Sequence, residues 1–353
     1  MWIRLRPALT LCGPGAMMQD EMLEVDASLR SLSPDAAIRG GDLPALRILL
    51  AAPRGFCAGV RRAIDAVVNA LERHGPPVYV RRPIVHNLAV VRSLEAQGAV
   101  FVEELDQISP GAVVVLSAHG VAPAVAEEAE RRGFTVYDAV CPLVAKVHRE
   151  VVRHHRDGRH IFLIGHEGHP EIVGTLGHVP AGAVTVLSGP DGVAAIERDR
   201  SAPHAYAVQT TYSVDEADAV IGLLEERFDD LVAPPASDIC YATTNRQKAI
   251  RAIAPRADAV IVAGEHFSSN ACRLAEVAAA AGCPSVQLVQ DASRIDWSRM
   301  PGSGGTVGIT AAASTPEIIV TAILDALRER YALAVEEVAA ADETTVFKPV
   351  RIG

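Results

Sequence analysis

Three cysteines stand where a thiol could bind a metal. Cys57, Cys141 and Cys240 each follow an apolar or extended segment and precede an amphipathic helical pattern. The dipole at a helix N-terminus favours the thiolate, which is the form that binds iron and zinc. The long intervals between the three exclude a local metal-binding knuckle, so three separate substructures would each supply one ligand to one centre. A metal with three protein ligands keeps a coordination position open for chemistry.

The competing interpretation is three buried structural cysteines, because free cysteine is among the most buried residue types. The equivalent setting of all three favours the metal site. Cys272 and Cys283 lie on or just after a predicted helix and are expected in the core or at the surface. Cys12 is expected to be inert.

Histidines follow three other apolar segments. His86, His119 and His169 each stand at the predicted exit of a strand. An imidazole there can bind an anion as a cation or as a neutral donor, but a neutral imidazole is also a zinc ligand. The three therefore fit either a diphosphate pocket or a zinc site. A solvated surface position is expected for His74, His148, His154, His155, His204 and His266.

Glu171 closes the Gly-His-Pro-Glu turn that contains His169. It is either a carboxylate that interacts with the N-terminus of a helix or a proton donor beside the metal. Small polar residues end other apolar segments, and each is a helix cap, a ligand for an anion, or both. These residues are Thr210, Thr211, Ser268, Ser269, Asn270 and Ser314.

Composition limits the class of protein. The 353 residues are 49% hydrophobic and carry a net charge of −10, which disfavours nucleic acid as a partner. No apolar run reaches the roughly 18 residues of a membrane helix. Six cysteines are too few for a disulfide scaffold, so we expect reduced thiols and a cytoplasmic protein.

The first 45 residues lack a sustained period and are expected to form a poorly ordered extension rather than a secretory signal. An alternative is translation from Met17, Met18 or Met22. From Leu46 onward, short apolar runs alternate with helical patterns, which predicts an α/β fold with parallel sheets. The predicted strands are 47–52, 78–80, 112–116, 135–137, 160–164, 184–187, 205–208, 259–263, 286–289 and 307–309.

The helical patterns cover 58–73, 123–132, 142–156, 214–227, 246–254, 272–281 and 316–331. Cysteine-bearing turns divide the chain into blocks of comparable size, so we expect α/β lobes at 46–140, 141–236 and 237–326, with a tail at 327–353 that packs on the first lobe. Ligands of open α/β sheets bind at the carboxyl ends of the strands, where the polar turns would lie.

Together these motifs resemble the LytB/IspH family, the 4-hydroxy-3-methylbut-2-enyl diphosphate reductases of isoprenoid biosynthesis. The resemblance spans about 46–352 and rests on segments such as Arg-Gly-Phe-Cys57-Ala-Gly-Val, Ser-Ala-His119-Gly, Gly-His169-Pro-Glu171 and Asp-Ile-Cys240-Tyr-Ala-Thr-Thr-Asn. So many motifs in the same order exclude coincidence.

The resemblance implies three lobes with pseudo-threefold symmetry around a 4Fe–4S cluster that Cys57, Cys141 and Cys240 bind. The substrate hydroxyl would bind the iron that has no protein ligand, and reductive dehydroxylation would give isopentenyl and dimethylallyl diphosphate, the last step of the non-mevalonate pathway. Glu171 with Thr210 would deliver the proton. The implied diphosphate ligands are His86, His119, His169, Ser268, Ser269, Asn270 and Ser314. Ferredoxin or flavodoxin would supply electrons, and a monomer is favoured.

The chain departs from the family pattern at Val140, Val173, Phe267 and Ala312, none of which is an implied cluster ligand. Two other functions stay open on the residues alone. One is a zinc hydrolase with a Cys/His site, and the other is a non-catalytic iron–sulfur redox sensor, which would not need the histidine and hydroxyl groups.

Overall fold

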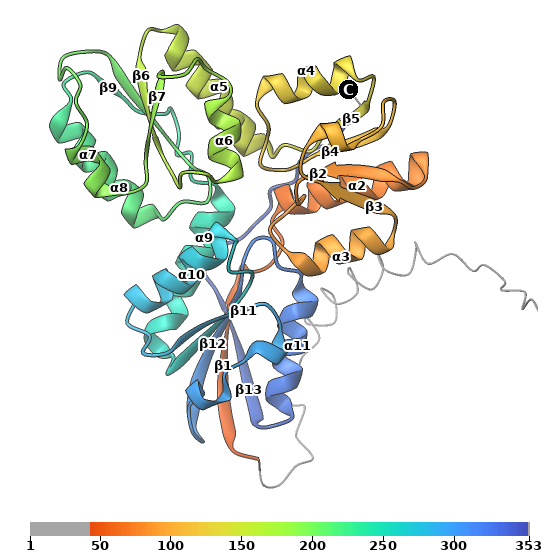
Figure 1. Ribbon diagram of the computed structural model, residues 1–353. Helices are drawn as coiled ribbons and strands as arrows, with labels where there is room; N and C mark the ends of the chain where they lie inside the picture. Colours follow the sequence, from red (N-terminus) through yellow and green to blue (C-terminus); the bar gives the residue numbers. More distant parts are fainter. Residues whose placement is uncertain (1–42, 352–353) are drawn as a thin grey trace, which may run out of the picture. The chain divides into compact units, whose positions relative to one another are not determined.

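The computed structural model describes residues 43–351 (Figure 1). Contacts divide the chain into two units, Met1–Leu43 and Pro44–Gly353, and the second carries every element named below. The expected N-terminal extension, with Cys12 and the alternative start positions, lies almost wholly outside the described residues. None of the helices within residues 43–351 is both long and apolar enough to cross a membrane.

Within this part of the chain the strands form three parallel sheets. The first sheet contains β2 (Val78–Arg81), β3 (Ala99–Val102), β4 (Val113–Leu116) and β5 (Thr135–Asp138). The second contains β6 (His160–Ile164), β7 (Val184–Leu187), β8 (His204–Val208) and β9 (Leu231–Val232). The third contains β1 (Ala45–Ala52), β10 (Ala259–Ala263), β11 (Val286–Val289), β12 (Gly305–Ala311) and β13 (Ala332–Ala339).

The sheets share one strand order. It is β3-β2-β4-β5 in the first sheet and β7-β6-β8-β9 in the second. The third sheet begins in the same way, with β11-β10-β12, and β1 then takes the place that β5 and β9 hold in the other two. Ile48 of β1 lies opposite Val307 of β12 and Val335 of β13. This repeated order confirms the predicted fold of three parallel α/β lobes.

The helices lie between the strands in the sequence. They are α2 (Ala58–His74), α3 (Leu88–Ala96), α4 (Pro123–Arg131), α5 (Pro142–Arg156), α6 (Pro170–Leu176), α7 (Pro190–Ala194), α8 (Val214–Arg227), α9 (Tyr241–Ile253), α10 (Ser269–Ala280) and α11 (Glu317–Arg328). Short 3₁₀ turns occupy η2 (Leu105–Gln107), η3 (Ala254–Arg256), η4 (Ala292–Arg294) and η5 (Trp297–Arg299).

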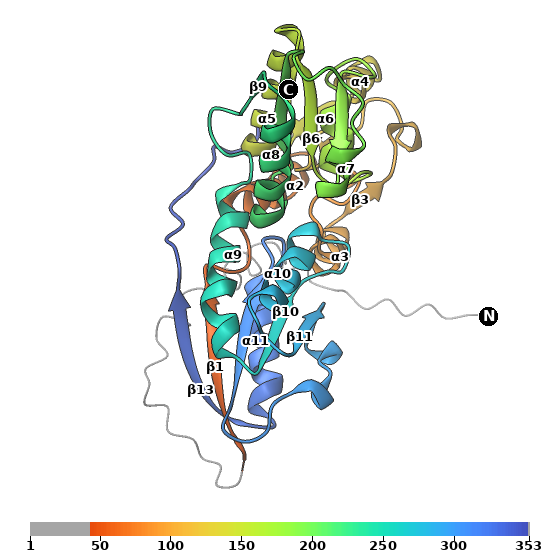
Figure 2. The ribbon, with the colours of Figure 1, turned by 90° about the vertical axis from the view of Figure 1, so that its left-hand side faces the viewer.

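Three of these helices carry the chain from one sheet to the next, and we call them the crossover helices. After β1, α2 packs on β2 and β4 of the first sheet. After β5, α5 packs on β6 and β8 of the second sheet. After β9, α9 packs on β1 and β12 of the third sheet, and Figure 2 shows α9 alongside β1. The path is therefore circular, because the last crossover returns to the sheet that contains the first strand.

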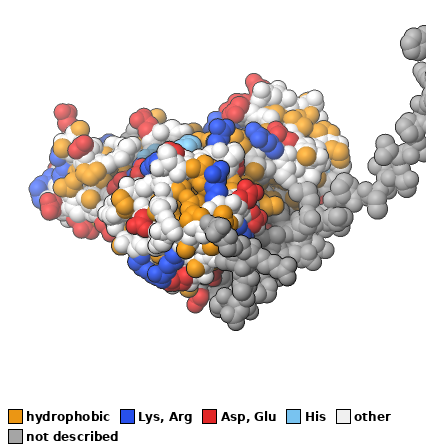
Figure 3. All heavy atoms as spheres, turned by 90° about the horizontal axis from the view of Figure 1, so that it is seen from below, with side chains coloured by type: hydrophobic (Ala, Val, Ile, Leu, Met, Phe, Trp, Pro, Cys, Tyr) orange, Lys and Arg blue, Asp and Glu red, His pale blue; other side chains and the backbone are white. Residues whose placement is uncertain are grey.

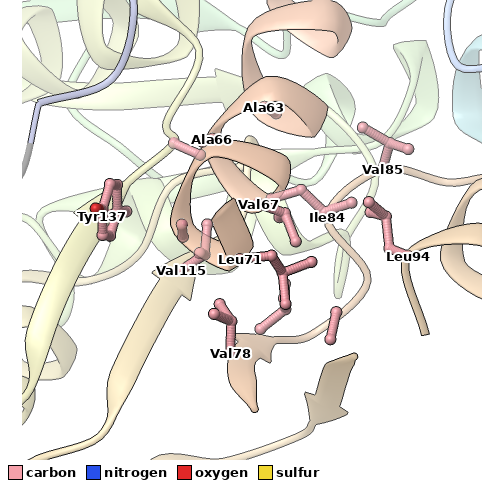
Figure 4. Close-up of a cluster of buried hydrophobic side chains, with 14 of the residues drawn as sticks. Ala63, Ala66, Val67, Leu71, Val78, Ile84, Val85, Leu94, Val115 and Tyr137 are labelled. Carbon is pink, nitrogen blue, oxygen red and sulfur yellow. The ribbon is translucent and has the colours of Figure 1, made fainter. Parts of the chain in front are cut away.

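The core under α2 shows how a crossover helix is held. Ala63, Val67 and Leu71 recur at helical spacing on its buried face and contact the first sheet around Val78 and Val115 (Figure 4). Burial of one such valine or leucine side chain contributes about 1.5–3 kcal/mol. The small residues between them let the helix lie close to the sheet, which fixes the position of its N-terminus.

All ten predicted strands are present. Sequence patterns do not reveal β3, β9 and β13, and all three lie at the edge of a sheet. An edge strand needs fewer apolar contacts, and β13 accordingly leaves Glu337 exposed and Glu336 half-buried in its Ala-Leu-Ala-Val-Glu-Glu-Val-Ala sequence.

The ranges of the three expected lobes stay a prediction. The range expected for the first lobe, 46–140, includes β1 of the third sheet as well as the whole first sheet. In the tail, Val350 packs against the core under α2, and the carbonyl of Lys348 accepts a hydrogen bond from Nε of Arg62 at 2.9 Å.

Candidate active site

The three cysteines are the N-cap residues of the crossover helices. Cys57 caps α2, Cys141 caps α5 and Cys240 caps α9. All three thiols are free and half-buried. The prediction that each cysteine opens a helix is therefore confirmed, and each stands where the chain leaves one sheet for the next.

The cysteine turns meet at one place. A Cβ atom added to Gly59 would lie 2.9 Å from Sγ of Cys141 and 3.8 Å from Sγ of Cys57. The hydroxyl of Tyr241, which follows Cys240, accepts a hydrogen bond from the N–H of Ala58 at 3.3 Å. Gly59 thus leaves open the space beside the sulfur atoms that any other residue would fill.

Burial dominates the electrostatics of the Cys141 and Cys240 thiols. It raises the pKa of Cys141 to about 12 and that of Cys240 to about 11, and the neighbouring Cys57 raises both pKa values further. Hydrogen bonds from the first turns of α5 and α9 lower these pKa values by less. At Cys141 and Cys240 burial therefore outweighs the stabilisation of the thiolate that the helix N-terminus was expected to give. A cation bound among the sulfur atoms would supply the missing stabilisation.

The donor set is chemically suited to a metal centre. Cysteine thiolates are the ligands that iron–sulfur clusters use, and here three separate turns each supply one cysteine. No group of three His, Cys, Asp or Glu side chains that could hold a metal ion is found in residues 43–351.

The three predicted histidines form a cluster. The ring centroids of His86 and His119 are 4.3 Å apart and stacked, and His169 lies edge-on to both at 5.4 and 5.9 Å. Burial lowers the pKa of His86 to about 4, that of His169 to about 3, and that of His119 well below its ordinary value. His86 and His169 further lower the pKa of His119, and His86 further lowers that of His169, so an anion is needed before the rings can hold protons together.

Glu171 lies on the first turn of α6, buried and bonded to Thr210. Its carboxylate accepts hydrogen bonds from the N–H and from the hydroxyl of Thr210, both at 2.7 Å. Burial raises the pKa of Glu171 to about 7, although the two bonds from Thr210 oppose the shift. The Thr210 carbonyl accepts the N–H of Cys240 at 3.0 Å, which links this carboxyl to a cysteine turn.

The small polar residues lie at the loops before α10 and α11. Ser268 caps α10 through the N–H of Ala271. Asn270 accepts the N–H of Ala313 at 2.9 Å through Oδ1, while its buried Nδ2 has no hydrogen-bond partner. Ser314 donates to the carbonyl of His86 at 3.1 Å. A buried free amide donor beside the histidine loop fits an anionic ligand.

Two further predicted residues join the second and third lobes. The hydroxyl of Thr211 donates to Oγ of Ser269 at 3.2 Å. Helix capping therefore explains the position of Ser268, and contacts between loops explain the positions of Thr211, Ser269 and Ser314.

Equivalent positions in the three sheets supply these groups. The second strand in the order of each sheet, β2, β6 or β10, leads to His86, His169 or Ser268. The third strand, β4, β8 or β12, leads to His119, Thr210 or Ser314. The fourth strand, β5, β9 or β1, leads to Cys141, Cys240 or Cys57. All of these residues follow the carboxyl ends of parallel strands, where open sheets bind ligands. The sequence places each residue at a strand exit, and the fold brings the exits together.

Sequence analysis missed residues that touch the cysteine site. The hydroxyl of Thr243 lies 3.2 Å from Sγ of Cys240, and its N–H donates to that sulfur at 3.4 Å. A threonine three positions after an N-cap residue is a signal that could have indicated this contact. Gly59 and Tyr241 have no comparable local signal.

Some histidines expected at the surface are buried, and the two remaining cysteines of the described residues have structural roles. His148, His154 and His204 are buried rather than solvated, and the rings of His148 and His204 pack against His178 and Phe162. Cys283 is buried, and Cys272 donates to the carbonyl of His266 at 3.1 Å.

Among the departures from the family pattern, Phe267 is about half exposed and lies edge-on to His86 at 5.7 Å, whereas Ala312 is fully buried. Val173 is exposed.

Comparison with known proteins agrees with this geometry. A family model described as LytB protein matches residues 48–328. 4-Hydroxy-3-methylbut-2-enyl diphosphate reductase 1 of Bradyrhizobium diazoefficiens is 51% identical over 306 residues, which are 86% of this chain and 95% of that protein.

Two solved structures are similar. The E-1-hydroxy-2-methyl-but-2-enyl-4-diphosphate reductase from Plasmodium falciparum superposes with a TM-score of 0.82 at 33% identity and covers 87% of this chain and 96% of that one. A (E)-4-hydroxy-3-methyl-but-2-enyl diphosphate reductase, described as the terminal enzyme of the non-mevalonate pathway, superposes with a TM-score of 0.59 at 29% identity and covers 80% and 99%. Since the family model spans most of the chain and the relatives align over nearly their whole length, the chain belongs to the LytB family.

Proposed function

We propose that this protein reduces 4-hydroxy-3-methylbut-2-enyl diphosphate to isopentenyl and dimethylallyl diphosphate, the last step of the non-mevalonate isoprenoid pathway. The substrate's allylic hydroxyl leaves as water, and two electrons and two protons are consumed. The observation that carries the proposal is the meeting of three cysteine N-caps beside a histidine cluster and a buried carboxyl. Membership in the LytB family supports it.

Cys57, Cys141 and Cys240 would hold a 4Fe–4S cluster. When bound, such a cluster supplies single electrons and, at the iron without a protein ligand, a Lewis acid for the substrate hydroxyl. The residues present fit this group, since the sulfur atoms converge, Gly59 leaves the space free, and the buried thiols need a cation to ionise.

His86, His119 and His169 would bind the diphosphate. Three clustered imidazoles, the free Nδ2 of Asn270 and the N–H groups at the start of α10 offer many donors to one polyanion. Acidic and basic side chains are interspersed over the face of the molecule in Figure 3. Attraction of the substrate therefore depends on the pocket, because the net charge of the chain is −10.

Glu171 would deliver the proton to the leaving oxygen. A pKa of about 7 leaves a large fraction of this carboxyl protonated at neutral pH, as a general acid requires. Thr210 holds the carboxyl in place through two hydrogen bonds, and its hydroxyl can relay a proton between Glu171 and the substrate. The protein supplies orientation, a dry site and the proton.

A one-electron donor must meet the cluster, and we infer ferredoxin or flavodoxin in the cytoplasm, where thiols stay reduced. We favour a monomer as the oligomeric state.

Replacement of Cys141 by serine tests the proposal. After anaerobic reconstitution we expect the unchanged protein to bind about four iron and four sulfide per chain and to reduce the substrate, and Cys141→Ser to lose both. Cys272→Ser, which removes a thiol elsewhere, serves as the control and should behave like the unchanged protein. Undiminished iron, sulfide and turnover in Cys141→Ser would refute the ligand assignment.

A further inference from the structure

Each crossover helix carries a basic residue on its second turn. These residues are Arg62 on α2, Lys146 on α5 and Arg246 on α9. None belongs to the histidine cluster or to the Glu171–Thr210 pair. Arg62 and Lys146 stand five residues after Cys57 and Cys141, and Arg246 stands six residues after Cys240, so their similar placement calls for a common explanation.

All three donate to the backbone just before a cysteine. Nη1 of Arg62 donates to the carbonyl of Val140 at 3.0 Å. Nζ of Lys146 donates to the carbonyl of Ser237 at 3.1 Å, and it also bonds the carbonyl of Ala236 and the carboxylate of Asp238. Val140 is the residue before Cys141, and Ala236, Ser237 and Asp238 lie four, three and two residues before Cys240.

Arg246 completes the pattern. Its Nε and Nη2 donate to the carbonyl of Gly55 at 3.1 and 2.7 Å, two residues before Cys57. The helix of Cys57 therefore holds the turn of Cys141, the helix of Cys141 holds the turn of Cys240, and the helix of Cys240 holds the turn of Cys57. The contacts form a closed ring, which we call the cation ring.

The contacts are of a strong kind. The Arg246 side chain is 0% exposed, as is that of Asp238, while Lys146 is 25% exposed. Hydrogen bonds from charged groups are stronger than neutral ones, and low dielectric surroundings strengthen them further. The tail secures two members, since Arg62 also donates to the carbonyl of Lys348 and Arg246 pairs with Glu343 at 2.8 Å.

We propose that Arg62, Lys146 and Arg246 are positioning residues that fix the three cysteine turns relative to one another and thereby determine how firmly the metal centre is held. This inference rests on the proposed function only for the identity of that centre. Each cation of the ring contacts the cysteine turn of a different helix and not that of its own helix. Loss of one cation should therefore loosen the cysteine turn that it contacts and leave the turn of its own helix in place.

Hydrogen exchange on the full-length protein, followed by mass spectrometry of peptides, tests the direction. The N–H groups of Cys57, Cys141 and Cys240 donate to the carbonyls of Ala313, Ala118 and Thr210. Arg62→Gln should speed exchange at the Cys141 turn by about tenfold, and Lys146→Met should do so at the Cys240 turn, in line with the loss of a charge-assisted hydrogen bond. Faster exchange confined to the substituted helix itself would overturn the proposal.

Iron retention tests the consequence. The reconstituted variants should release iron to a chelator about tenfold faster than the unchanged protein. Arg61→Gln, Arg149→Gln and Lys248→Gln remove exposed cations from the same three helices and should leave the release rate unchanged. Arg62→Lys keeps a donor for Val140 and should restore most of the retention. Equal release rates in ring and control variants would overturn the inference.

The two proposals fail differently. If the unchanged protein takes up no iron and sulfide, the proposed function fails, whereas the exchange experiment still decides the ring. Arg62 and Lys146 are partly exposed, so the experiment does not depend on the fully buried Arg246, whose variants could misfold.

Discussion

Replacement of Glu171 by glutamine removes an acidic proton and leaves the shape of the site nearly unchanged. The amide oxygen can still accept the N–H of Thr210, which bonds the carboxylate at 2.7 Å in the unchanged protein. The Thr210 hydroxyl can rotate to accept from the new NH₂ group instead of donating. We therefore expect the substrate to bind with nearly unchanged affinity.

Glu171→Gln should instead reduce turnover. A positioned general acid accelerates proton transfer by about 10² to 10⁴ times, so kcat should fall at least about a hundredfold. In the unchanged protein kcat should decline as pH rises above 7, because the pKa of Glu171 is about 7 and only the protonated carboxyl is an acid. Glu171→Gln should lack this decline.

The pH dependence of the stability of the metal-free protein gives a second test of the ionisation of Glu171. Burial raises the pKa of Glu171 from 4.5 to about 7, so the native state keeps this proton to a higher pH than the unfolded chain does. The resulting stability is complete below pH 4.5 and is lost as pH rises through about 7. Above that pH, Glu171→Gln should be more stable than the unchanged protein by on the order of 3 kcal/mol.

Anaerobic turnover with a chemical reductant, calorimetric titration with substrate and denaturant unfolding at several pH values measure these quantities. Glu167→Gln is the matched control, since it neutralises an exposed carboxylate in the same turn and should change neither kcat nor its pH dependence. Unchanged turnover in Glu171→Gln, or the same pH dependence of kcat in both proteins, would remove the proton-donor role.

Three more outcomes are expected. Gly59→Ala places a Cβ 2.9 Å from Sγ of Cys141 and should lower the iron and sulfide content after reconstitution by more than half. The circular dichroism spectrum of the metal-free protein should stay unchanged, because alanine favours a helix. Full iron content would contradict the fit of the site. Binding of pyrophosphate at pH 7 should take up protons, because the anion raises the lowered pKa values of the histidine cluster, so affinity should weaken as pH rises. Titration calorimetry in buffers of different ionisation enthalpy measures this uptake, and none would count against the histidine assignment. Asn270→Asp keeps the acceptor for Ala313 but loses the free Nδ2 donor, and it should weaken pyrophosphate binding by about tenfold or more; unchanged affinity would exclude that donor from the anion site.

Local patterns were sufficient for much of the fold. Apolar runs revealed the central strands, and a cysteine between an extended segment and a helical pattern marked each crossover. The start of α9 was harder, because Thr243 and Thr244 are weak helix formers and the pattern begins only at Arg246, whereas the helix begins at Tyr241. Capping by Cys240 through the N–H of Thr243 stabilises that first turn.

Residue types at strand exits also indicated the candidate site. Cysteines, histidines, Glu171 and the hydroxyl residues carried the chemistry in the sequence, and the strand exits placed them at one end of parallel sheets. Their ionisation could not be predicted, since burial depends on the packing of all three lobes. Burial raises the pKa of Cys141 to about 12, against the expectation from a helix N-terminus, and raises that of Glu171 to about 7.

Local sequence patterns revealed the central strands, the longer helices and the side chains that could do chemistry, because these depend on neighbours a few positions away, whereas the edge strands β3, β9 and β13 left no such pattern. The tertiary structure alone decided that β1, near the start of the described chain, completes a sheet whose other strands come from its last third. That pairing closes the circle of lobes and brings Cys57 beside Cys141, with Tyr241 linking in the turn of Cys240. Backbone hydrogen bonds between distant strands leave no local pattern, so their partners become known only when the chain has folded.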